Sequence, residues 1–390
     1  MTAGALMSAI FALRMAGLFM ILPVFALYAV TLPGGDSSLW IGIALGAFGL
    51  AQALMHIPMG MCSDRFGRRP VIVCGLLCYV AGSLLAAAAP DIYWLVVARV
   101  IQGAGAIAAV LTALAADLTR IQHRTKVMAM IGSSIGVTFA LSLVLAPPLA
   151  AWLGLRGLFL LIAGFAILAL GLTFHPIFSK GHVGGKVRQP VDLLQTMRLA
   201  LHDYDIRVIF FGVFVLHTTQ TMLWIVVPQK LASQGLMLLD HWQLYLPALA
   251  VSFLIMLPLI IWAERQHRLR FAMLIGILFL FLAQPALGNA TDVWSIVLAL
   301  TLFFIGFNVL EALLPALLSR LIHSGSRGAL MGMYNTVQSA AIAFGGIGGG
   351  WLIQYSGQAV AYLLGSVFVL LWLVSARRTR VAAVDEEIIP

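Results

Sequence analysis

Between two long apolar runs, the sequence reads Gly60-Met-Cys-Ser-Asp64-Arg65-Phe-Gly67-Arg68-Arg69-Pro70. The flanking runs, residues 38–60 and 70–89, contain no Asp, Glu, Lys or Arg. Each run is about as long as the roughly 20 residues that a helix needs to cross a bilayer. A short basic loop between two such helices is typical of the cytoplasmic face of an integral membrane protein. The stretch therefore predicts two spanning helices joined on the cytoplasmic side.

The rest of the chain repeats this pattern. Its 390 residues are 62% hydrophobic and only 9% charged, whereas soluble domains are about 25% charged. Lipid must therefore cover most of the surface, and helices suit lipid because they satisfy their own backbone hydrogen bonds. We predict an all-α polytopic membrane protein with twelve spans, at residues 5–31, 38–60, 70–89, 92–116, 128–151, 156–177, 207–228, 243–263, 271–289, 293–318, 328–352 and 357–376.

A polar, basic stretch divides these spans into two groups of six. The predicted units are an N-terminal six-helix bundle (1–177), a cytoplasmic central loop (178–206), a C-terminal six-helix bundle (207–376) and a cytoplasmic tail (377–390). The halves also echo each other, because Leu118-Thr-Arg-Ile-Gln-His123 is similar to Leu318-Ser-Arg-Leu-Ile-His323. Repeated six-helix halves are typical of secondary transporters, whose substrate site lies between the halves near mid-membrane.

The distribution of positive charge predicts the orientation. All but four of the 23 Lys and Arg residues fall in the even-numbered connections or the C-terminal tail. The exceptions are Arg156 and Lys230, in odd-numbered connections, and Arg14 and Arg99, inside spans. By the positive-inside rule, both termini lie in the cytoplasm, and the predicted location is the bacterial inner membrane. Because the basic residues are scattered between apolar runs, the net charge of +9 does not indicate nucleic-acid binding.

The sequence indicates neither an enzyme nor a metal or cofactor site. The three cysteines, Cys62, Cys74 and Cys78, show neither metal-ligand clustering nor a disulfide framework. No G-x-x-x-x-G-K-[ST] loop is present, so ATP-driven transport is not expected. The first apolar run carries Arg14 in its middle and continues to about Val30, which predicts a spanning helix rather than a cleavable signal peptide.

Three motifs resemble those of the major facilitator superfamily. The loop after span 2 matches its signature loop at Gly60, Asp64, Arg65, Gly67, Arg68 and Arg69, and departs from it at Cys62. Span 4 matches the second motif at Leu95, Arg99, Gln102, Gly103, Gly105 and Ala106. Span 5 matches the antiporter motif only in part, because Ala146 stands before Pro147 where the family has glycine. The resemblance implies a major facilitator fold of two pseudo-symmetric six-helix bundles that works by rocker-switch alternating access.

The same resemblance implies a cytoplasmic latch. Asp64 is expected beside the start of helix 11, near Gly328, where the partial positive charge of a helix N-terminus favours a carboxylate. Arg68 is expected to reach Asp117 at the cytoplasmic end of span 4. These contacts would hold the halves together in the outward-facing state and break on the way to the inward-facing state.

A single acidic residue, Glu311, falls deep inside a predicted span. Burial disfavours a charged carboxylate, so this group is the predicted proton-binding site. The alternative is a permanent hydrogen bond from Glu311 to Asn308 or to the backbone. Arg14 is either the counter-charge of Glu311 or a contact for an anionic substrate, and the sequence leaves both open.

Other polar residues inside spans are also candidates. Arg99 has either a role in proton handling and coupling or a structural role, bonded to Gln102. His217 lies in a polar run and is either a proton carrier facing a cavity or a structural histidine. The residues expected to line the cavity are Trp224, Gln220, Asn335 and Gln338.

Span 1, with Leu13-Arg14-Met15, and span 10, with Phe307-Asn308 and Glu311, are most similar to proton-driven efflux transporters of the superfamily. The one transporter type most similar to this chain has a soluble domain after the twelfth helix, and no regulatory role of that domain is carried over to this chain. We predict a monomeric proton-coupled antiporter that exports a small, lipophilic or cationic molecule, with that substrate, protons and the lipid bilayer as its partners. The alternatives are a proton symporter or facilitator that imports a sugar, organic acid or amino acid, and a non-transporting membrane sensor.

Overall fold

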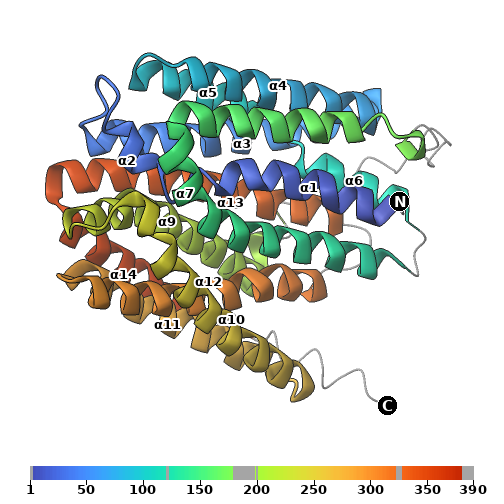
Figure 1. The fold of residues 1–390 in the computed structure, drawn as a ribbon. Coiled ribbons are helices and arrows are strands. Elements are labelled where there is room, and N and C mark those ends of the chain that lie inside the picture. The colour runs from blue at the N-terminus through green and yellow to red at the C-terminus, as the bar shows by residue number, and fades with distance from the viewer. Residues whose placement is uncertain (1–2, 120–122, 179–197, 199–200, 322–326, 380–390) are drawn as a thin grey trace.

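Long apolar helices make up the part of the chain that the structure describes, a computed structural model covering residues 3–119, 123–178, 198, 201–321 and 327–379. The helices lie roughly side by side, and no strand occurs among these residues (Figure 1). An apolar helix is stable in a bilayer because its backbone groups bond within the segment. The predicted all-helical fold is confirmed.

Ten helical segments in this part of the chain are long and apolar enough to cross a membrane, with the two short helices between Ile92 and Ala115 counted as one segment. One of them, α7 (Arg124–Leu172), has 49 residues and turns at Gly154, where φ is 65°, so it supplies two crossings. The sequence predicts these crossings as separate helices, whereas the structure joins them. The short helices α1 (Ala3–Phe19) and α2 (Phe25–Ala29) form one further crossing in series. Dividing α7 and adding α1 with α2 gives the twelve predicted crossings.

Aspartates begin three of the other helices. Asp91 accepts a hydrogen bond from the backbone N–H of Trp94, and Asp203 accepts one from Ile206. Asp292 accepts one from Ser295, and this bond is the largest cause of the lowered pKa of Asp292. The remaining elements are α3 (Ser38–Phe66), α4 (Arg68–Ala88), α5 (Ile92–Ala104), α6 (Ala108–Asp117), α9 (Tyr204–Ser233), η3 (Leu238–Asp240), α10 (Trp242–Arg265), α11 (Leu269–Asn289), α12 (Val293–Leu321), α13 (Arg327–Ser356) and α14 (Gln358–Ala376).

Two predicted spans are broken rather than continuous. Span 1 is interrupted between α1 and α2, where Pro23 has no N–H to contribute to a helix. Span 4 is interrupted at residues 105–107, between α5 and α6. Non-helical backbone persists inside a membrane only where other protein groups satisfy it. Arg14 meets this need, because its guanidinium donates to the carbonyl oxygen of Gly105 at 3.4 Å.

Each half contributes its second and fifth crossings to the contact between the halves. α3, the second crossing of the first half, packs along α13, the fifth of the second half. α10, the second crossing of the second half, packs against α7, whose first part is the fifth crossing of the first half. A two-fold rotation exchanges these two contacts, so the halves are pseudo-symmetric bundles.

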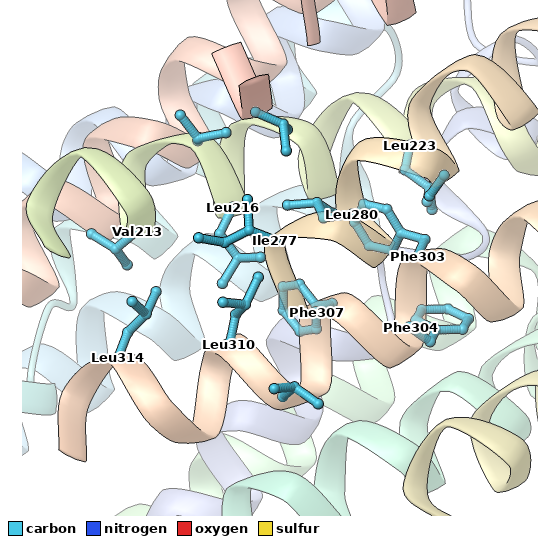
Figure 2. Close-up of a cluster of buried hydrophobic side chains, with 14 of the residues drawn as sticks. Val213, Leu216, Leu223, Ile277, Leu280, Phe303, Phe304, Phe307, Leu310 and Leu314 are labelled. Carbon is cyan, nitrogen blue, oxygen red and sulfur yellow. The ribbon is translucent and has the colours of Figure 1, made fainter. Parts of the chain in front are cut away.

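The core of the second half is built around α12. Figure 2 shows side chains of this helix gathered with Val213, Leu216 and Leu223 of α9 and Ile277 and Leu280 of α11. Phe139 of α7, in the other half, has its ring centroid 5.9 Å from that of Phe307. The α12 helix therefore joins its own core to the opposite half. The buried α12 side chains labelled in Figure 2 are Phe303, Phe304, Phe307, Leu310 and Leu314.

Candidate functional site

The helices α3 and α13 approach each other closely at one end of the bundle and separate toward the other. We call the end that carries Arg65 and Arg268 the basic end; α1 starts there (Figure 1). At the opposite end, a Cβ atom on Gly346 of α13 would lie only 2.6 Å from the carbonyl oxygen of Gly42 on α3. Toward the basic end, a Cβ atom on Gly60 of α3 would meet no atom within 4 Å. The contact between these helices is therefore closed at the opposite end and open at the basic end.

Glu311 and His217 form a polar pair between α12 and α9. The Nε2 atom of His217 lies 3.3 Å from Oε2 of Glu311. His217 is buried, whereas the side chain of Glu311 is 40% exposed. The buried Oε2 atom has no aligned hydrogen bond, and the hydroxyl of Tyr334, which lies within electrostatic range of Glu311, has none either. One side of the carboxyl therefore faces a histidine, and the rest of it is open.

The hydrogen bonds of His217 define where its protons can lie. Its Nδ1 atom is 3.1 Å from the carbonyl oxygen of Val213, which can only accept, so Nδ1 carries a hydrogen. In the neutral ring, Nε2 is then an acceptor, and the amide Nε2 of Gln338 donates to it at 2.6 Å. An ionised Glu311 beside this lone pair would be repelled. The contact is attractive only when one proton lies on Glu311 or on Nε2 of His217.

The structure separates several residues that the sequence grouped with Glu311. Asn308 donates to the hydroxyl of Ser252 at 2.8 Å, which gives it a partner other than Glu311. The structure does not place Arg14 beside Glu311: Arg14 is buried in the first half against Tyr79 and Gly105. The glutamate takes its polar contact from His217 instead.

The predicted cavity residues also differ in their surroundings. Trp224 does not line an open cavity: it is completely buried and its ring packs against Tyr245 and Phe304. Gln220 is buried as well, whereas Asn335 and Gln338 are partly exposed. The sequence shows that these four residues lie on polar or aromatic stretches of their helices. Only the packing of the neighbouring helices decides which of these stretches faces an open space.

A second polar cluster lies inside the first half, away from Glu311. Arg99 is 1% exposed and donates to Oε1 of Gln102, whose amide donates to Ser83 at 2.9 Å. The guanidinium of Arg99 also lies 4.5 Å from the ring centroid of Phe48. Among the described residues, no carboxylate lies within ion-pair distance of Arg99 or Arg14. These contacts favour the structural alternative for Arg99. Gly103, one residue beyond Gln102, allows α5 to approach the backbone of Phe48 closely.

We expect the Gln102→Leu variant to be destabilised, because it removes the acceptor of a buried guanidinium. A hydrogen bond to a charged group contributes about 1.5–3 kcal/mol, so the midpoint of thermal unfolding in detergent should fall by several degrees. The control is Gln266→Leu, at an exposed position after α10. Equal unfolding midpoints for the two variants would show that the Arg99–Gln102 contact is not structural.

The charged loop after α3 forms a small network. Arg68 lies 2.6 Å from Asp64 and 3.3 Å from Asp117, which brings together the predicted pair at the end of span 4. The side chain of Asp64 is 69% exposed. Arg65 lies over the ring of Phe66 and Arg69 over that of Phe174. The turn itself needs glycine, since Gly67 has φ 93°. The side chains at Arg327 and Gly328, near which Asp64 is expected, lie outside the described residues.

In span 5, α7 remains helical through Pro147 and Pro148 and buries Ala146 completely. Two contacts of the site were not among the sequence candidates. They are the Ser252 hydroxyl and the Tyr334 hydroxyl, which are single polar groups on apolar helices. A lone serine or tyrosine in a membrane helix carries no positional signal in the sequence, because many such residues bond only to their own helix.

Comparisons with known proteins agree with this architecture. The family model for the Major Facilitator Superfamily matches residues 6–203 and 209–387. The inner membrane transport protein YajR of Escherichia coli is 39% identical over 370 residues, which cover 94% of this chain and 81% of that protein. The multidrug resistance protein MdtH of Sodalis glossinidius is 28% identical over 346 residues, which cover 86% of this chain and 82% of MdtH. The crystal structure of the nucleoside transporter NupG has the same fold, with a TM-score of 0.71 at 10% identity, covering 97% of this chain and 98% of that chain.

Proposed function

Because the chain belongs to the major facilitator superfamily and is a multi-pass membrane transporter, not an enzyme, we propose that it is a proton-coupled antiporter that exports a small molecule. One observation carries the proposal: the carboxyl of Glu311 contacts His217 on one side, while the rest of this side chain is accessible from outside the protein core. A proton stabilises the contact with His217, and a substrate cation can pair with the ionised carboxylate. Because both ligands require the same group in different states, binding of one opposes binding of the other.

The orientation completes the transport cycle. We place the basic end in the cytoplasm, in the inner membrane, because basic loops are retained on that side. The structure then corresponds to an inward-facing state, closed at the opposite end by α3 and α13. Rocking of the two halves about the central site would open that end and close the basic end. One chain carries both halves of the site, so a monomer is sufficient.

Aromatic side chains near Glu311 favour a lipophilic or cationic substrate. Phe307 lies one helical turn before Glu311 and packs edge-to-face against His217, with 5.9 Å between the ring centroids. Tyr334 is the other aromatic residue beside the carboxyl. A carboxylate next to aromatic rings suits organic cations, because ring faces attract positive charge. Similarity to MdtH, named as a multidrug resistance protein, agrees with this choice.

A flux measurement tests the direction of coupling. Everted membrane vesicles with an acid interior and a pH-sensitive dye inside would be given lipophilic cations, sugars, organic acids and amino acids in turn. Antiport predicts that addition of a lipophilic cation makes the interior more alkaline, because protons leave as substrate enters. Acidification on addition of a sugar or an acid would instead establish symport. Substrate uptake with no proton movement would establish a facilitator.

We expect the Asp64→Asn variant to lower the transport rate about tenfold with little change in stability of the present state. In this state Asp64 is largely exposed, and an exposed ion pair contributes at most about 1 kcal/mol. Of the two proposed latch contacts, Arg68–Asp117 is already present in this state, whereas the contact of Asp64 with the start of α13 would form only when the basic end closes. The measurement is transport together with thermal unfolding, and the control is Asp36→Asn, at an exposed site near the other end. A wild-type transport rate in Asp64→Asn would contradict the latch.

A further inference from the structure

A hydroxyl group on α13 forms hydrogen bonds with α3, midway along the contact between these two helices, which belong to different halves of the protein. The Oγ atom of Ser339 lies 3.1 Å from Nε2 of His56 and 3.2 Å from Oε1 of Gln52, both on α3. All three side chains are at most 5% exposed. A serine hydroxyl has one hydrogen, which it gives to the Gln52 carbonyl oxygen, so it accepts from the N–H at Nε2 of His56. We call this set of hydrogen bonds the α3–α13 clasp.

The clasp lies where the two helices begin to separate. On the side of the opposite end, a Cβ atom on Gly49 of α3 would lie 2.7 Å from the carbonyl oxygen of Ser339 itself. On the side of the basic end, Cβ atoms on Gly60 and on Gly332 of α13 would meet nothing within 4 Å. The α3–α13 clasp therefore lies at the inner limit of the closed region, where rocking of the halves must begin or end.

The residue before Ser339 belongs to the proposed proton site. Gln338 donates from its amide to Nε2 of His217, the same atom that faces Glu311. Two consecutive residues of one helix thus contact opposite halves of the protein. One contacts His217 in the second half, and the other contacts α3 in the first half.

We propose that Gln338 and Ser339 are positioning residues that connect the protonation of the His217–Glu311 pair to the α3–α13 clasp. This inference rests on the proposed function, in which the pair binds and releases the coupled proton. It assigns a role to a pair of neighbouring side chains that do not themselves bind that proton.

The hydrogen-bond chemistry gives the connection its direction. While Glu311 holds the proton, Nε2 of His217 has a free lone pair and accepts from Gln338. If the proton moves to Nε2, the ring becomes a double donor, and the amide of Gln338 must turn its oxygen toward the ring or withdraw. If the proton leaves altogether, Glu311 repels the lone pair, and the three groups must separate. In both cases one hydrogen bond between α13 and α9 changes, beside the contact of Thr218 with the carbonyl oxygen of Ala341.

Small movements of α13 are sufficient to break the clasp. Its two hydrogen bonds are already 3.1 and 3.2 Å long, so a shift of about half an ångström takes them beyond useful hydrogen-bond length. Two further charged or titratable groups face these contacts. Arg14 interacts electrostatically with His56, and Tyr334 interacts electrostatically with Glu311.

The test measures how far the basic end opens at two pH values. Cysteines are introduced at Met61 of α3 and at Gln266 after α10, in a variant without the native cysteines, and both carry spin labels. Double electron–electron resonance in lipid nanodiscs then gives the distance between the two halves. Both positions are exposed. We expect the wild-type distance distribution to change between pH 5.5 and pH 8, and Gln338→Leu to lose at least two thirds of this change. Ser339→Ala weakens the α3–α13 clasp, so molecules open at the opposite end should become more frequent at both pH values. The labels would report them as a larger population with a short distance at the basic end.

Further variants separate this inference from the proposed function. Glu311→Gln tests the proton site itself and should abolish the pH response. Thr336→Val, on the same helix, removes a hydroxyl that bonds only to Gly332 of its own turn and should respond like the wild type. Gln338→Glu keeps the size of the side chain, and its carboxylate favours a protonated His217, so it should move the midpoint of the response to higher pH by about one unit.

The outcomes are distinguishable. A full wild-type response in Gln338→Leu, together with a lost response in Glu311→Gln, overturns the role of Gln338 and leaves the proton site intact. A full response in Glu311→Gln overturns the proton site and the present inference with it. A lost response in both, with Thr336→Val unchanged and Gln338→Glu shifted, supports the connection.

Discussion

Substrate-driven proton movement should disappear when Glu311 is replaced by glutamine. The amide keeps the shape of the side chain and can donate to Nε2 of His217, so the contact survives, but no proton can be released from it. We expect the rate of substrate-dependent alkalinisation to fall at least tenfold, which corresponds to about 1.4 kcal/mol or more in the barrier. Substrate binding should weaken, because the carboxylate that pairs with the substrate cation is gone, while the aromatic contacts of Phe307 and Tyr334 remain.

The control for this variant is Glu264→Gln. Glu264 is also a glutamate on the second half, but its side chain is 65% exposed at the basic end, where it lies 3.5 Å from Arg320. Its replacement should leave proton movement within about twofold of the wild type, because exposed ion pairs contribute little. If Glu311→Gln retains wild-type proton coupling while its expression and unfolding match Glu264→Gln, the proton must be carried by another group.

The second large effect is expected for Gly346→Ala. The new methyl group would lie 2.6 Å from the carbonyl oxygen of Gly42 and 2.7 Å from the Cα atom of Gly46, both on α3. These are backbone atoms, which cannot move aside without the whole helix. Overpacking of this kind costs about 1–3 kcal/mol, and here the cost falls only on the state in which α3 and α13 touch. We expect transport to fall at least tenfold and the closed end to open.

Gly348 provides the matched control on the same helix. A Cβ atom there would meet only the ring of Phe344, at 3.9 Å, which is an ordinary contact. Gly348→Ala should therefore transport at the wild-type rate. Labels placed across the opposite end should show a longer distance in Gly346→Ala only. Equal distances and equal rates in the two variants would mean that close packing of α3 on α13 is not required for the cycle.

The charged loop from Gly60 to Pro70 and the uncharged runs on either side were enough to predict membrane-spanning helices and the family. This prediction works from sequence because lipid imposes one strong requirement, internal satisfaction of every backbone hydrogen bond, on each segment separately. The isolated acidic residue Glu311 stood out for the same reason, since a carboxyl inside an apolar helix is costly wherever its neighbours lie.

The partners of these residues depend on how the helices pack. The sequence paired Glu311 with Asn308 or Arg14, whereas the structure gives it His217, which is 94 positions away along the chain. Arg14 turns instead toward the broken backbone at Gly105, and Trp224 lies in the core. A helical period specifies which residues share a face, but not which neighbouring helix that face meets.

The sequence by itself determined the number and character of the spans, because each obeys the same local rule of length and polarity. Only the tertiary structure decided that Gln338 meets His217 while Ser339 meets His56, and that the glycines of α3 and α13 close one end of the protein. Those contacts join segments separated by more than a hundred residues. Their geometry is fixed by the close fit of whole helices, and no local pattern in the chain encodes such a fit.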